Sequence, residues 1–142
     1  DIFYMKKIKN DLIIQTSKLL CKKNEIEFAY LFGSYSKMKT NKLSDIDIAV
    51  FINNYKDINI LQYKSELISE LISFLQSNKV DLVVLNNASP LLKHQIVKYG
   101  TIILSNNEKS RINFEVNSLK EYIDTKRIRD IQNIYLKKRY SA

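Results

Sequence analysis

The chain has 142 residues, a formal net charge of +8, 45% hydrophobic residues and 27% charged residues. This length fits one domain, and this balance is typical of a globular protein rather than a disordered or fibrous one. No apolar run approaches the ~20 residues that span a bilayer, which argues against a membrane protein. The single cysteine, Cys21, excludes an internal disulfide and suits a cytoplasmic location.

The positive net charge attracts polyanions, which include nucleic acid, nucleotide phosphates and acidic protein partners. The charge does not choose between them. Lysine, asparagine and isoleucine are abundant together, and the base composition of a genome alone produces that combination. Contact with nucleic acid is therefore not favoured over the other partners, and a functional prediction has to rest on motifs.

The spacing of apolar residues predicts helices and strands in alternation along the chain. A short, aromatic and continuous apolar run indicates a buried strand, and recurrence at three and four residues indicates an amphipathic helix. In chain order we expect a helix at 6–21, strands at 26–32 and 45–51, a helix at 58–75, a strand at 80–85, a helix at 90–99, a strand at 101–104 and a helix from about 108.

Local signals support one of these helices. Ser89 is a typical N-cap before Pro90, and Gly100 is a natural stop for the same helix. The last helix is expected to pack through one apolar side. That side consists of Leu119, Tyr122, Ile123, Ile128, Ile131 and Tyr135.

The order of elements predicts an α+β (mixed α/β) fold, in which helices flank a small mixed β-sheet. Too few residues join the first two strands for a crossover helix, so this pair is expected to be antiparallel and the sheet mixed. Residues 1–142 are expected to form a single domain, with the C-terminal helix from about 108 as its last element.

The most informative segment contains Gly33-Ser34, then ten residues, then Asp45-Ile46-Asp47. Gly33 lets the backbone approach a ligand because no Cβ is in the way, and Ser34 adds a hydroxyl and an N–H for a phosphate. Two aspartates two positions apart on a strand point to the same side. Their like charges repel, so they need a cation or a proton, and carboxylates with phosphates are typical ligands of Mg²⁺.

A third carboxylate, Asp81, lies among apolar residues in the predicted strand 80–85. An aspartate inside a buried strand is costly unless it is paired or binds a metal. If this strand lies beside the strand of Asp45 and Asp47, the three carboxylates suit two metal ions roughly 3.5–4 Å apart, the arrangement for in-line displacement at phosphorus.

The segment LFGSYS…SDIDIAV, with Gly-Ser, ten residues and Asp-x-Asp, resembles the signature of the polymerase-β-like nucleotidyltransferases. It is most similar to their minimal members, the MNT antitoxins that are paired with HEPN ribonuclease toxins. VDLVVLNNASPLLKHQIVKYGTIIL is similar to the segment that follows in those proteins. The resemblance covers roughly residues 25–105, and it departs from larger relatives in lacking a second glycine after Gly33-Ser34.

The resemblance implies a nucleotidyltransferase fold and an enzyme that transfers AMP to its target (AMPylation). The implied substrate is ATP, and the implied cofactor is Mg²⁺, of which two ions are expected. It assigns Gly33 and Ser34 to the nucleotide phosphates, and Asp45, Asp47 and Asp81 to the metal and to catalysis. The implied acceptor is a tyrosine hydroxyl on a partner HEPN toxin, which makes the chain an antitoxin. Two alternatives stay open: an antitoxin that acts by binding alone, and a nucleotidyltransferase that acts on RNA or a small molecule.

Two further residues bear on these alternatives. HEPN nucleases, as the resemblance implies, use an arginine followed by a histidine; the only histidine, His94, precedes every arginine, so the chain is not expected to be the toxin. Tyr35, next to the phosphate turn, is the candidate for stacking on a nucleotide base.

Overall fold

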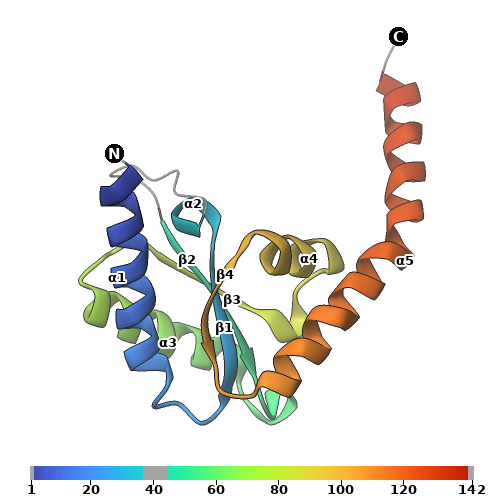
Figure 1. Cartoon of the computed structure of the whole chain (residues 1–142). Coiled ribbons are helices and arrows are strands. Elements are labelled where there is room, and N and C mark those ends of the chain that lie inside the picture. The colour runs from blue at the N-terminus through green and yellow to red at the C-terminus, as the bar shows by residue number, and fades with distance from the viewer. Residues whose placement is uncertain (1, 37–44, 141–142) are drawn as a thin grey trace.

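The computed structural model describes residues 2–36 and 45–140 (Figure 1). Every predicted helix and strand is present. The elements are α1 (Ile2–Leu20), β1 (Ile26–Phe32), α2 (Gly33–Ser36), β2 (Ile46–Ile52), η1 (Tyr55–Asp57), α3 (Ile60–Leu75), β3 (Val80–Val84), η2 (Leu85–Asn87), α4 (Pro90–Tyr99), β4 (Thr101–Ser105) and α5 (Glu108–Tyr140). The first helix begins at Ile2, earlier than predicted. Most of the segment between the first two strands, residues 37–44, lies outside the described residues.

The four strands form one mixed sheet in the order β3-β2-β1-β4. β1 pairs with β2 and with β4 in antiparallel fashion, and β2 pairs with β3 in parallel. The expectation of an antiparallel first pair in a mixed sheet, and with it the α+β fold class, is confirmed. β1 is flanked on both sides, which explains why its sequence is an almost uninterrupted apolar run.

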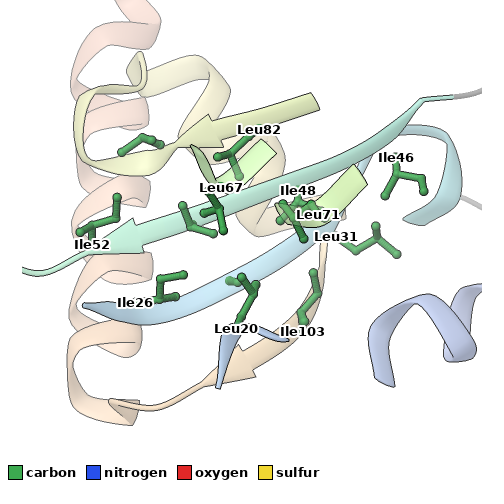
Figure 2. Close-up of a cluster of buried hydrophobic side chains, with 13 residues drawn as sticks. Leu20, Ile26, Leu31, Ile46, Ile48, Ile52, Leu67, Leu71, Leu82 and Ile103 are labelled. Atoms are coloured by element: carbon green, nitrogen blue, oxygen red, sulfur yellow. The ribbon is translucent and has the colours of Figure 1, made fainter. Parts of the chain in front are cut away.

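Helices cover both faces of the sheet (Figure 1). α1 and α3 lie on one face, and α4 and the first half of α5 lie on the other. Figure 2 shows the core beneath α1 and α3, where Leu67 and Leu71 of α3 gather with Ile48 of β2 and Leu82 of β3. A smaller cluster under α4 and α5 contains Phe28, Tyr30, Ala49, Leu85, Ile96 and Phe114. Alternate residues of β1 and β2 therefore serve different cores.

α5 is far longer than the part of the sheet that it covers. Its 33 residues correspond to about 50 Å of helix, and its C-terminal half extends away from the body (Figure 1). The expected apolar side of this helix is not buried: Leu119, Ile123 and Ile131 are 50–60% exposed. Phe114 and Ser118 face the body instead, because only the first turns lie over the sheet.

None of the helices in the described part of the chain, α5 included, combines the length and the hydropathy that crossing a bilayer requires.

A partly buried polar contact joins α5 to the sheet. The Tyr30 hydroxyl of β1 donates a hydrogen bond to Glu115 Oε1 at 2.5 Å, and Arg111 Nη1 donates to the same oxygen at 2.7 Å. Burial, followed by the hydrogen bond to Glu115, raises the pKa of Tyr30. The hydroxyl therefore stays protonated and serves as a permanent donor.

Tyr30→Phe is expected to lower the free energy of unfolding by about 1 kcal/mol, because it removes one net intramolecular hydrogen bond while Arg111 still pairs with Glu115. Urea denaturation measures this. Tyr63→Phe is the matched control, since the buried Tyr63 hydroxyl has no hydrogen-bond partner within the described residues. The control should lose nothing or gain slightly. Equal losses in the two variants would show that the bond to Glu115 does not stabilise the fold.

Candidate active site

The candidate site lies at the N-terminal end of β2, on the face that carries α4 and α5. Ile46 and Ile48 point into the core under α1 and α3, so Asp47 between them points the other way. Asp47 is partly buried there and Asp45 is exposed. Strand alternation thus places Asp47 on this face, and Asp45 directly precedes the first residue of β2.

Strand register brings the third carboxylate to the same place. Asp81 of β3 is the direct partner of Asp47 across the parallel β2–β3 pair, and neighbouring strands lie about 4.8 Å apart. On its other side Asp47 pairs with Phe32, the last residue of β1. The expectation that the strand of Asp81 lies beside that of Asp47 is therefore confirmed.

The expected burial of Asp81 is wrong, because its side chain is exposed. β3 is the edge strand of the sheet, and Asp81 lies near its N-terminal end. The apolar neighbours in the sequence pack on the opposite face or further along the strand. Asp81 is thus an accessible carboxylate beside a partly buried one, which suits a group that meets an incoming substrate.

Gly33 lies directly against Asp47 at the end of β1. Its φ is +70°, a left-handed conformation that side chains rarely adopt. A Cβ on Gly33 would lie 3.0 Å from Asp47 Cγ and closer still to Oδ2. The Asp47 carboxylate therefore occupies the space that any side chain at position 33 would need. Gly33 and Ser34 also begin α2, so the predicted phosphate turn directly adjoins the predicted metal ligands.

The electrostatics of the site disfavour an uncompensated negative charge. Burial, then the charge of Asp81, then the charge of Asp45 raise the pKa of Asp47 from 3.8 to about 6. The shift shows that both other carboxylates act on Asp47. A cation bound near Asp47 would relieve the repulsion between the three carboxylates. If position 47 served only the stability of the fold, a neutral amide there would be more favourable than the carboxylate.

The donor set fits Mg²⁺ shared with a nucleotide. No three His, Cys, Asp or Glu side chains within 2–36 and 45–140 are arranged as a complete metal site. Mg²⁺ typically takes one or two carboxylates and completes its shell with water and substrate phosphates. Asp47 with Asp45 or Asp81 supplies such a pair, next to the turn where phosphates are expected.

A recess adjoins the site on the side of α4. It has a volume of about 210 Å³ and is lined by Phe32, Gly33, Leu92, Gln95, Ile96 and Tyr99. The sequence prediction did not include the α4 residues. Their spacing at 92, 95, 96 and 99 marks one side of a helix, but only the packing of α4 shows that this side meets Gly33.

Two other aromatic or titratable residues lie elsewhere. Tyr35 packs against the core under α1 and α3, so the expectation that it stacks on a nucleotide base is wrong. His94 stacks on Tyr122 of α5, with ring centres 3.7 Å apart. This contact gives His94 a role in joining α4 to α5, which agrees with its exclusion from the predicted site.

A family model described as polymerase beta nucleotidyltransferase matches residues 15–109. The chain belongs to the polymerase-β nucleotidyltransferase family. The matched region contains Gly33, Ser34, Asp45, Asp47 and Asp81 and all four strands. The resemblance inferred from the motif is thereby confirmed.

Two curated relatives of this nucleotidyltransferase are described as adenylyltransferases. The protein adenylyltransferase MntA of Shewanella oneidensis is 45% identical over 76 residues, which are 54% of this chain and 52% of MntA. A putative protein adenylyltransferase of Methanocaldococcus jannaschii is 31% identical over 83 residues, 58% of this chain and 84% of the relative. The match to MntA thus spans about half of that protein's length.

Solved structures extend the likeness over most of the nucleotidyltransferase. A chain from a toxin–antitoxin crystal structure with AMP-PNP superposes with a TM-score of 0.70 at 32% identity, covering 87% of this chain and 98% of that one. A chain from the tri-AMPylated Shewanella oneidensis HEPN toxin in complex with MNT antitoxin gives a TM-score of 0.66 at 31% identity, with 89% and 98% covered. The nucleotidyltransferase fold expected from the resemblance is confirmed.

Asp47→Asn is expected to stabilise the metal-free protein at pH 7 by roughly 1 kcal/mol, because it removes a partly buried charge and its screened repulsion from Asp81 and Asp45. The pKa of Asp47 is higher in the folded chain than its ordinary value, so the folded state binds more protons between pH 4 and 6. The gain should therefore be largest above pH 6 and disappear toward pH 4. Urea unfolding across this range is the measurement, with the exposed Asp57→Asn as control. A gain that does not depend on pH would contradict the assignment.

Gly33→Ala is expected to lower the free energy of unfolding by about 1–3 kcal/mol, because a Cβ at this φ is strained and displaces the Asp47 carboxylate. Ser34→Ala changes only a hydroxyl and should leave stability nearly unchanged. Thermal unfolding of both variants is the measurement. An unchanged stability of Gly33→Ala would mean that the turn can move away from Asp47 at little cost.

Proposed function

We propose that this nucleotidyltransferase is a Mg²⁺-dependent protein adenylyltransferase that moves AMP from ATP onto a tyrosine hydroxyl of a partner HEPN toxin, and so acts as its antitoxin. The observation that carries the proposal is the placement of Asp47 directly between Asp81 of β3 and Gly33 of the phosphate turn. Support comes from the adenylyltransferase relatives and from the similar chain found with an AMPylated HEPN toxin.

In this proposal Asp45, Asp47 and Asp81 hold two Mg²⁺ ions, and Gly33 and Ser34 hold the triphosphate. Bound Mg²⁺ would neutralise charge that develops on the phosphate during transfer. Asp47 is the central ligand because both other carboxylates act on it. Ser34 offers its hydroxyl and the turn offers backbone N–H groups to the β- and γ-phosphates.

Asp81 is the residue placed to handle the acceptor. Its exposed carboxylate accepts the proton of the acceptor hydroxyl as the oxygen forms a bond to the α-phosphorus. The bond from the α-phosphorus to the bridging oxygen breaks, and pyrophosphate leaves with the electron pair. Because Asp45 and Asp81 are both open to solvent, a side chain on the surface of another protein can reach the site.

The partner needs a docking surface larger than the catalytic recess, since specific interfaces bury about 800 Å² on each side. The projecting half of α5 offers one. It exposes Ile128, Ile131 and Tyr135 along one side, and residues 123–140 carry six basic and two acidic side chains. An acidic partner with an apolar groove fits this helix.

Two further parts of the proposal concern organisation. Residues 1–142 act as one catalytic domain, from which α5 projects. The protein is located in the cytoplasm, which agrees with the exposed free thiol of Cys21. The main competing function is inhibition by binding alone, which the exposed apolar side of α5 favours. It differs from the proposal in requiring no transfer.

The double variant Asp45→Asn with Asp47→Asn is expected to abolish AMP transfer and leave docking nearly intact. Losing both anionic ligands removes the metal and several kcal/mol of transition-state stabilisation, which at 1.36 kcal/mol per tenfold is a loss of many hundredfold. The measurement is the mass of a HEPN toxin that binds the wild-type chain, taken after incubation with ATP and Mg²⁺, alongside a pull-down of the same toxin.

The double variant Asp11→Asn with Asp57→Asn changes the net charge equally at exposed positions of α1 and η1, and it should retain transfer and docking. Ile131→Asp should weaken docking without altering ATP binding. Unmodified toxin in the presence of wild-type chain, ATP and Mg²⁺, together with normal docking, would favour inhibition by binding alone. Loss of docking in the folded Asp45/Asp47 variant would show that transfer and docking share one surface.

A further inference from the structure

The recess beside Gly33 is joined to the catalytic carboxylates through two residues. Phe32 lines the recess and is the cross-strand partner of Asp47. Gly33 lines it as well, and the Asp47 carboxylate occupies the space beside its Cα. A molecule with its phosphates at the Gly33-Ser34 turn therefore has its remaining part within reach of this recess.

The size and lining of the recess fit one planar ring system. Its volume of about 210 Å³ is smaller than the roughly 300–1,000 Å³ of sites that enclose a whole drug-sized ligand. Phe32, Leu92 and Ile96 make it mostly apolar, Tyr99 adds an aromatic ring, and Gln95 is the one side-chain amide. Predominantly apolar walls with a single well-placed polar group are typical of a site that recognises a ring by its edge.

We propose that this recess holds the adenine base of the nucleotide, with Tyr99 stacking on the base and Gln95 reading its edge. The inference rests on the proposed function and adds the origin of base preference to it. Adenine presents an N6 donor beside an N7 acceptor, and a glutamine amide matches both with its oxygen and its nitrogen. Guanine presents two acceptors on that edge, so the Gln95 oxygen would lose its partner.

The charge around the recess also suits a nucleotide. The Lys98 ammonium lies 5.2 Å from the centre of the Tyr99 ring, so a cation lies beside one of the residues that line the recess. Gln95 and Tyr99 are four residues apart on α4 and thus lie on the same side of this helix. In this proposal residues of α4 recognise the base, and residues at the ends of the strands bind the phosphates and the metal.

The test is calorimetry of the full chain with non-hydrolysable ATP and GTP analogues, each with Mg²⁺. Wild type should bind the ATP analogue about tenfold to a hundredfold more tightly, the range for one matched bidentate contact. Gln95→Met keeps the length of the side chain and removes the amide, so the ATP-to-GTP affinity ratio should fall toward one. Tyr99→Ala should weaken both analogues by a similar factor and keep the ratio, while Tyr99→Phe should bind like wild type.

Gln15→Met is the matched control, because Gln15 is exposed on α1, which covers the opposite face of the sheet. Its affinity ratio should equal that of wild type. Binding of both analogues without discrimination by wild type, or an unchanged ratio in Gln95→Met, overturns the base site and leaves the proposed function standing. Failure of wild type to bind either analogue with Mg²⁺ overturns both.

Discussion

The carboxylate of Asp47 lies in the space that a side chain at position 33 would fill, between two other acidic groups, and the rest of the candidate site is arranged around it. Burial and the charges of Asp81 and Asp45 raise its pKa, so the folded chain maintains a repulsion that a neutral residue would avoid. Repulsion of this kind is typical of sites that bind a cation. The bound cation removes the repulsion, so the free energy that the repulsion costs the empty site adds to the affinity for the cation. Gly33 is required by the same geometry, since only a residue without a Cβ can approach this closely.

The two faces of the sheet differ in what they contain. The face under α1 and α3 contains most of the buried aliphatic side chains and fixes the strands in place (Figure 2). The face under α4 and α5 has a smaller aromatic cluster, and the candidate site lies on this face, at the C-terminal end of β1 and the N-terminal ends of β2 and β3. Because strand residues alternate between faces, Ile46 and Ile48 can anchor β2 in one core while Asp47 between them serves the site.

α5 shows how the same helix serves stability and exposure. Its first turns are held by Phe114 in the aromatic cluster and by the contact of Tyr30 with Glu115 and Arg111. The stack of His94 on Tyr122 then joins it to α4. Beyond this point the helix leaves the body (Figure 1). A helix of this composition gains little by standing alone in water, so its exposed isoleucines are consistent with a surface that a partner covers.

The sequence by itself determined the order of helices and strands, the mixed sheet, and the alternation that turns Asp47 away from Ile46 and Ile48, because apolar periodicity and strand alternation are local properties. It also placed Gly33-Ser34 before Asp45 and Asp47, from which the family resemblance followed. Only the tertiary structure decided that Asp81 is the direct partner of Asp47 yet exposed at an edge strand, that Tyr35 packs against the opposite core, and that Gln95 and Tyr99 line one recess with Gly33. The apolar side of α5 was expected to be buried because periodicity reports which residues share a side of a helix, not whether anything lies against it. Strand register and helix packing depend on contacts between residues far apart in the chain, and no local pattern contains them.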